Sequence, residues 1–200
     1  FKEMGQQAKE IPESRVDKII SQRQLKVEGV SQKALSSAIK VYLKVKDDID
    51  SDSSIKAAGI NCLNESFYSD STPCIAWSLL YEDKGLIWSC EADTSSMMSL
   101  YLINKSLNAK IMMSNIYPFL MGMAALKHER INNFPEVEEP ENHALVVHCG
   151  YFGVVPRPFC TSWTVRPKVL DIVDENAIAT DARLPEGDLT IAKLDPSLKE

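Results

Sequence analysis

The sequence lacks the features by which several large classes of protein are identified. Its 22 Lys and Arg residues form no cluster and are outnumbered by 28 Asp and Glu residues, so the net charge is −6. A chain of this charge offers no basic stripe for nucleic-acid phosphates. It also has no apolar run of membrane-spanning length and no signal peptide. We therefore expect a cytoplasmic protein that binds neither nucleic acid nor a membrane.

Two further absences concern chemistry. The five cysteines are odd in number and contain no Cys-x-x-Cys pair, which disfavours a disulfide framework or a zinc site and indicates buried thiols in a reducing compartment. The sequence also has no Gly-x-Gly-x-x-Gly, Walker or Gly-x-Ser-x-Gly motif, so it carries no motif for dinucleotide, nucleotide or serine-hydrolase chemistry. The cysteines are Cys62, Cys74, Cys90, Cys149 and Cys160.

The composition is that of a globular protein with a substantial core. The chain has 200 residues, of which 44% are hydrophobic and 25% charged. It opens at Phe1 without an initiator Met, from which we expect a piece of a longer protein. The acidic segment 136–141 is the best candidate for a domain boundary. We predict a Rossmann-like α/β domain over residues 1–140, with a parallel sheet flanked by helices, and the start of a β-rich sheet or barrel domain over 141–200.

Apolar periodicity predicts strands that alternate with helices in the first of these domains. We expect strands over 55–62, 86–88 and 109–113, and helices that begin near Pro12, Ser31, Pro73 and Thr94. Such strands pair in parallel through right-handed crossovers, which brings their carboxyl ends to one edge. Residues 1–11 are expected to be irregular or the tail of a missing element, and the Met-rich segment 119–125 to pack in the core. Further strands are expected over 144–147, 168–173, 177–182 and 189–194.

Polar side chains follow several of the predicted strands. Glu91 and Asp93 come after strand 86–88 and beside a helix N-terminus, Asn115 follows strand 109–113, and His148 ends strand 144–147. Ligands of open α/β sheets bind at this edge, and helix N–H groups favour the anionic carboxylates used in metal ligation or acid–base chemistry. The alternative stays open that Glu91 and Asp93 belong to a helix cap and a solvated turn, and that His148 is structural.

Three segments together resemble the L-fucose isomerase-like family, within the fucose/arabinose isomerase group. These segments are CEADTSSMMSLYLINKSLNAKIMMSNIYPF, VVHCGYFGVVPRPF and ARLPEGDLTIAKL. The upstream stretches AAGINCLNES and PCIAWSLLYEDKG also fit the middle domain of that family. The similarity runs from about Ser31 onward, and its specificity comes from the order and spacing of the motifs.

The resemblance implies aldose–ketose isomerisation of a sugar through an enediol, with Mn²⁺ or another divalent cation holding adjacent substrate oxygens. It implies that Glu91 is a metal ligand and the proton-transfer residue, and it aligns Asn115 with a second metal ligand that is aspartate in the family. An amide oxygen can bind a metal but cannot act as a base. We assign His148 and Asp93 to the substrate side. The resemblance also implies a small-molecule sugar as partner and a homo-oligomer.

Three functions stay open at this point. In the first, the chain is part of a sugar isomerase. We then expect it to be inactive as it stands, because the third metal ligand that the resemblance implies is a histidine expected beyond its last residue. Alternatively, it belongs to a non-catalytic sugar-binding relative, for which Asn115 is the best support. The third alternative is a structural α/β domain without a ligand.

Overall fold

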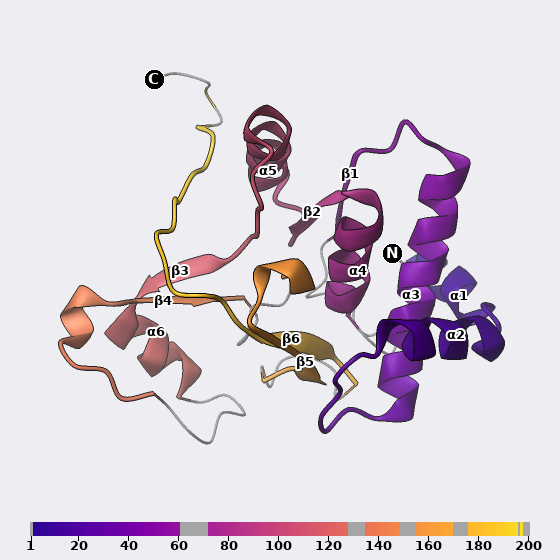
Figure 1. Ribbon diagram of the computed structural model, residues 1–200, viewed down its shortest axis with the longest axis horizontal. Helices are drawn as coiled ribbons and strands as arrows, with labels where there is room; N and C mark the ends of the chain where they lie inside the picture. Colours follow the sequence, from indigo (N-terminus) through magenta and orange to yellow (C-terminus); the bar gives the residue numbers. More distant parts are fainter. Residues whose placement is uncertain are drawn as a thin grey trace.

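The computed structural model describes residues 2–60, 72–127, 135–148, 155–169, 176–195 and 197. The mixed α/β class predicted from the sequence is confirmed, with helices and short strands interleaved along the chain (Figure 1). The α-helices are α1 (Lys2–Lys9), α2 (Glu13–Arg23), α3 (Gln32–Ser51), α4 (Cys74–Lys84), α5 (Thr94–Leu107) and α6 (Phe119–Leu126). The strands are β1 (Ala57–Ile60), β2 (Ile87–Cys90), β3 (Asn115–Pro118), β4 (Ala144–Val147), β5 (Ser162–Pro167) and β6 (Ile178–Arg183), and the 3-10 helices are η2 (Pro140–Asn142) and η3 (Arg157–Phe159).

The strands of the described residues form three two-stranded sheets. β1 and β2 are parallel, with Gly59 opposite Ser89, as predicted for a Rossmann-like unit. β3 pairs antiparallel with β4, and β5 pairs antiparallel with β6. Within the described part of the chain, the parallel sheet is therefore limited to one pair of strands and is smaller than the predicted one.

The core forms where α3 and α4 pack together and against β2. α3 begins at the predicted cap, because the Ser31 hydroxyl accepts a hydrogen bond from the Ala34 N–H at 3.1 Å. α4 ends at the predicted Gly85, whose φ of +61° suits glycine. Trp88 of β2 is fully buried and meets the Tyr81 ring edge to face, with centroids 5.2 Å apart. The buried residues of α3 are Ala34, Leu35, Ser36, Ala38, Ile39, Val41, Tyr42, Leu43 and Val45.

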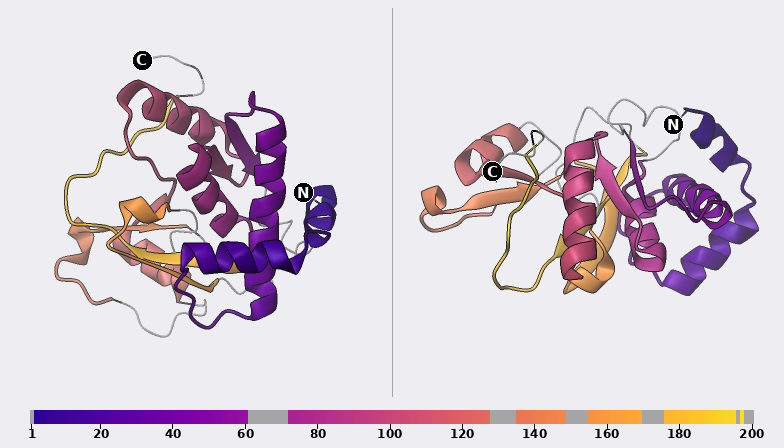
Figure 2. Two further views of the ribbon diagram at one scale, coloured as in Figure 1. Left: turned by 45° about the vertical axis from the view of Figure 1, so that its right-hand side comes forward. Right: turned by 90° about the horizontal axis from the view of Figure 1, so that it is seen from above.

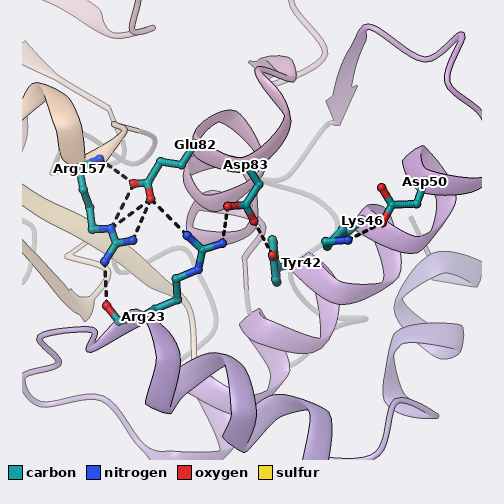
Figure 3. A network of polar contacts seen from close by, with 7 residues as sticks. All are labelled: Arg23, Tyr42, Lys46, Asp50, Glu82, Asp83 and Arg157. Atoms are coloured by element: carbon teal, nitrogen blue, oxygen red, sulfur yellow. Dashed lines mark hydrogen bonds and ion pairs between the residues drawn. The ribbon is translucent and has the colours of Figure 1, made fainter.

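A cluster of charged side chains ties α2, α3, α4 and η3 together (Figure 3). Glu82 accepts hydrogen bonds from the Arg157 backbone N–H at 2.9 Å and from Arg157 Nη2 at 2.8 Å. Arg23 pairs with Asp83, which also accepts a 2.5 Å hydrogen bond from the Tyr42 hydroxyl. Burial, followed by the nearby Asp83 carboxylate, raises the pKa of Tyr42 to about 12. We call these five residues the Glu82 cluster.

Two sequence predictions about the N-terminal half are wrong. Residues 2–9 form α1 instead of irregular chain, because Ala8 is buried and Met4 packs against the core. The segment 109–113 is not a strand. Its Ile111 packs with Ile87 and Leu100, but the hydrogen-bonded strand begins at Asn115, where β4 provides a partner.

The Met-rich segment 119–125 is a helix, but most of it does not lie in the core as predicted. Phe119 and Gly122 are buried, whereas Leu120 and Met121 are 59% and 68% exposed. Gly122 is the point of closest approach to the sheet, because a Cβ there would lie 2.6 Å from Leu145 Cδ2. α6 therefore covers the β3–β4 pair with one narrow face and leaves its other apolar side chains exposed.

Predictions for the C-terminal third are confirmed in part. β4 matches the predicted strand 144–147, and β6 covers most of the predicted strand 177–182. The segment 189–194 is not a strand. It follows β6 as an extended segment held on α5, where the Leu194 N–H donates to Ser99 Oγ at 2.8 Å. The predicted strand 168–173 lies mostly outside the described residues.

Elements from both sides of the predicted domain boundary contact each other. β3 pairs with β4 across the acidic segment, and the Val165 N–H of β5 donates to the Lys26 carbonyl at 2.8 Å. The boundary near residue 140 stays a prediction. None of the helices in the described ranges has both the length and the apolar character that crossing a bilayer requires.

Candidate functional site

Glu91 lies where the sequence predicts, in the turn that joins β2 to α5. Both Glu91 and Ala92 have a φ of +57°, and the Asp93 N–H donates to the Cys90 carbonyl at 3.1 Å. Two successive positive φ values are typical of a type I′ turn, which favours Asn and Gly. Left-handed backbone costs a non-glycine residue about 1–2 kcal/mol. Such strain concentrates at functional sites, and here it holds an exposed carboxylate at the end of a buried strand.

Asp93 is the N-cap of α5, which is the alternative role that the sequence leaves open for it. Its carboxylate accepts hydrogen bonds from the Ser96 N–H at 2.9 Å and the Ser96 hydroxyl at 2.7 Å. It also pairs with Lys193 at 2.9 Å. These hydrogen bonds to Ser96, and then Lys193, lower the pKa of Asp93 to about 2. The carboxylate is therefore occupied by the helix end, and its predicted role on the substrate side stays a prediction.

Asp93→Ala is expected to lower the free energy of unfolding by about 1–2 kcal/mol, because α5 loses its cap. Urea denaturation followed by circular dichroism measures the change. Asp188→Ala is the matched control, because Asp188 is exposed in the segment before residue 189. We expect the control to change the stability by less than about 0.5 kcal/mol. Equal effects of the two substitutions would contradict the capping role.

Asn115 and His148 lie at the same end of the β3–β4 pair. Asn115 lies opposite Val147 in the register, and His148 is the next residue of the same strand end. Asn115 therefore begins a strand and does not follow one, which corrects the predicted topology of this part of the site. Asn115 and His148 lie at the same end of this pair because β4 runs antiparallel to β3.

His148 is 1% exposed. Burial, and then the positive charge of Lys168, lowers the pKa of His148 to about 4. Lys168 is itself buried at the end of β5, where its N–H donates to the Ala177 carbonyl at 2.8 Å. At neutral pH the imidazole is therefore neutral, with one ring nitrogen as donor and the other as acceptor.

Lys168 was not predicted as a site residue, because it falls in the predicted strand 168–173. A signal was present, since Lys168 is the one cation of that segment. His143, by contrast, is exposed. His128, Cys149 and the end of the predicted strand 55–62 lie outside the described residues.

The predicted residues form two pairs. Glu91 and Asp93 share one turn, and Asn115 and His148 share one strand pair. No hydrogen bond or ion pair among the described residues joins Glu91 or Asp93 to Asn115. Figure 1 shows β2 and the β3–β4 pair as separate elements, joined along the chain by α5 and the segment that follows it.

The described residues do not by themselves fit the divalent cation that the resemblance implies. No group of three His, Cys, Asp or Glu side chains in the described ranges is arranged to hold a metal ion. The oxygens of Asp93 are taken up by Ser96 and Lys193, and Asn115 offers only a neutral oxygen. We therefore derive no chemical step through a metal.

The fold is mixed α/β. Glu91 and Asp93 lie at the end of its parallel strand pair, and Asn115 and the buried His148 lie at one end of the β3–β4 pair. No family model, curated protein or solved structure matches the chain.

Proposed function

We propose that the chain is part of a cytoplasmic aldose–ketose isomerase that acts on a fucose- or arabinose-type sugar. In this proposal Asn115 and His148 bind sugar hydroxyls, and Glu91 transfers the proton. The observation that carries it is the register of β3 with β4, which sets Asn115 opposite Val147, the residue before the buried His148. The resemblance of the sequence to the L-fucose isomerase-like family supplies the reaction class.

The hydrogen-bonding character of the Asn115–His148 pair suits a sugar. Each hydroxyl of a sugar is both a donor and an acceptor, and so are an amide and a neutral imidazole. A pKa of about 4 keeps His148 in this form throughout the neutral range. Small-molecule sites fix their ligands with a few polar groups of this kind at otherwise apolar surfaces.

Glu91 is the carboxylate best suited to the proton transfer. A base must take the proton from the carbon next to the carbonyl, which leaves an enediolate, and then return it to the former carbonyl carbon. A second proton moves from the neighbouring hydroxyl to the former carbonyl oxygen, so that the hydroxyl carbon becomes the new carbonyl. The Glu91 carboxylate is exposed and makes no hydrogen bond or ion pair among the described residues. Asp93 is less suited, because its pKa of about 2 and its two hydrogen bonds to Ser96 favour the bound anion.

Asn115 favours a second candidate function, a sugar-binding relative without turnover. An amide cannot move a proton, and it is a weaker metal ligand than the aspartate of the family. The two functions share the same binding residues and differ only in what Glu91 does. The experiment therefore has to measure binding and turnover separately.

The test uses the full-length protein with a panel of aldoses and their polyols, in buffer with and without Mn²⁺. Calorimetry measures binding, and ketose formation measures turnover. Glu91→Gln is expected to leave polyol binding unchanged and to lower turnover by about 10²- to 10⁴-fold. His148→Gln is expected to weaken binding by about tenfold through a lost hydrogen bond.

His143→Gln is the matched control, since this histidine is exposed at the other end of β4. Binding without turnover in the wild-type protein would favour the non-catalytic relative. Full turnover by Glu91→Gln would contradict the role of that residue. If no sugar or polyol binds to the folded protein, both functions are wrong.

A further inference from the structure

The chain after β6 is an extended segment that runs away from the sheet and returns to α5. Figure 1 and Figure 2 show this segment in yellow, leaving β6 and ending beside the helix. Leu189 and Ile191 within it are 59% and 68% exposed. Between residues 185 and 192 no backbone group hydrogen-bonds to another described residue. The position of the segment therefore depends on its two ends.

The first end is fixed where the chain leaves β6. The Arg183 carbonyl accepts hydrogen bonds from the Thr161 N–H at 2.8 Å and from the Thr161 hydroxyl at 3.1 Å. Leu184 packs against the hydrophobic core. This end therefore belongs to the β5–β6 sheet and to the core beneath it.

The second end is fastened to the first two turns of α5. The Leu194 N–H donates to Ser99 Oγ at 2.8 Å, and the Ser95 hydroxyl donates to the Leu194 carbonyl at 3.4 Å. Lys193 Nζ pairs with the Asp93 carboxylate at 2.9 Å. Ser99 is 3% exposed, so the hydrogen bond that it accepts is shielded from water. We call these five residues the α5 latch.

Asp93 belongs both to the α5 latch and to the turn that carries Glu91. Its carboxylate holds the Ser96 N–H and hydroxyl as well as Lys193. Its own N–H donates to the Cys90 carbonyl and closes the turn, in which Glu91 has a φ of +57°. Left-handed backbone of this kind persists only where the surrounding structure holds it. Part of that support comes from Lys193, which is 100 residues away from Asp93 along the chain.

We propose that residues 184–195 are a strap whose α5 latch positions the Glu91 turn, with Lys193 as a positioning residue that acts through Asp93. When the latch is closed, the Asp93 carboxylate is held from both sides and the turn is fixed. When the latch opens, the turn loses its contact with Lys193. A segment with so few contacts opens locally while the rest of the protein stays folded. The effect on turnover rests on the proposed function, whereas the effect on the turn does not.

Amide hydrogen exchange of the whole chain, followed by NMR and corrected for intrinsic rates, tests the latch. The Leu194 N–H has a hydrogen-bond partner, and the N–H groups of Thr190 and Ile191 have none among the described residues. We expect Leu194 to exchange at least about tenfold more slowly than these two. Lys193→Gln combined with Ser99→Ala should remove most of this difference, because an ion pair and a hydrogen bond are lost. Equal exchange of the three amides in the wild-type protein would overturn the proposal.

The same double variant shows whether the latch supports the turn. We expect it to speed exchange at the Asp93 and Ser96 amides by about threefold, although neither residue is changed. The matched control is Lys105→Gln with Ser106→Ala, which alters the same residue types at exposed positions in the last turns of α5. The control should change the two amides by less than about twofold. If the double variant releases Leu194 and leaves both amides unchanged, the strap does not position the turn.

Steady-state kinetics of the full-length protein separates positioning from substrate binding. Lys193→Gln is expected to lower kcat by about threefold to tenfold without a change in KM or in polyol affinity. Lys193→Arg retains the charge and should restore most of kcat. Unchanged kcat in Lys193→Gln, or the same loss in Lys105→Gln, would overturn the positioning role. A wild-type protein without turnover would contradict the proposed isomerase instead, and the exchange measurements would still decide whether the strap holds the turn.

Discussion

Replacing Glu82 with Gln is expected to lower the free energy of unfolding by about 3 kcal/mol, because two guanidinium groups lose a shared carboxylate. The Glu82 side chain is 9% exposed and lies between Arg157 at 2.8 Å and Arg23 at 3.8 Å (Figure 3). Loss of one partner from a buried ion pair leaves the remaining charges uncompensated. The two arginines are partly exposed and can recover some hydration, so we expect the lower end of the usual range.

Urea denaturation at pH 7 measures this change, with Asp47→Asn as the matched control. Asp47 forms a bidentate salt bridge with Arg15, in which each N–H···O contact is 2.8 Å long, but both side chains are more than 40% exposed. An exposed pair of this kind contributes at most about 1 kcal/mol. If Glu82→Gln and Asp47→Asn destabilise the protein equally, the Glu82 cluster does not hold α2, α4 and η3 together.

A double substitution separates the pair from its surroundings. Glu82→Gln combined with Arg157→Gln is expected to be less destabilising than the sum of the two single substitutions, because the two side chains act as a unit. Additive effects would mean that each side chain acts through other contacts, such as the hydrogen bond from Arg157 Nη1 to the Arg23 carbonyl at 2.8 Å.

The parts of the fold that local chemistry determines could be predicted from the sequence. The Ser31 cap, the Gly85 end of α4 and the start of α2 after Pro12 depend on residues within one helical turn. The buried run before Glu91 likewise predicts β2. In each case the residue type at the boundary favours that conformation without help from distant parts of the chain.

The errors concern contacts between distant segments. α1 is polar overall and is held by contact with α3, which its own sequence does not indicate. β5 was not predicted, and it forms through pairing with β6 and a bridge between Val27 and Val165. Contacts between distant segments also limit the prediction of the candidate site, because only one of its two residue pairs is local in the sequence. Glu91 and Asp93 are two residues apart in the sequence, whereas Asn115 and His148 share one end of a strand pair only through the register of β3 with β4.

His148 is expected to make the stability depend on pH in a range where few other groups titrate. Its pKa is about 4 in the folded protein, below the ordinary value of 6.5. Between these two values the unfolded chain binds a proton that the folded protein does not, so the free energy of unfolding falls as the pH falls. The full effect between pH 6.5 and pH 4 is about 3 kcal/mol.

Urea denaturation at several pH values between 7 and 4.5 tests this slope. The carboxylates whose pKa values are lowered, such as Asp93 and Glu13, affect stability mainly below pH 4.5, because they stay ionised in both states above it. His148→Gln is expected to remove most of the slope, whatever its effect on stability at pH 7. His143→Gln should retain the slope, because His143 is exposed. A slope that survives His148→Gln would mean that other groups produce it and that the pKa of His148 is not lowered in the folded protein. The lowered pKa would then no longer support a neutral imidazole as the donor and acceptor that the proposed function requires.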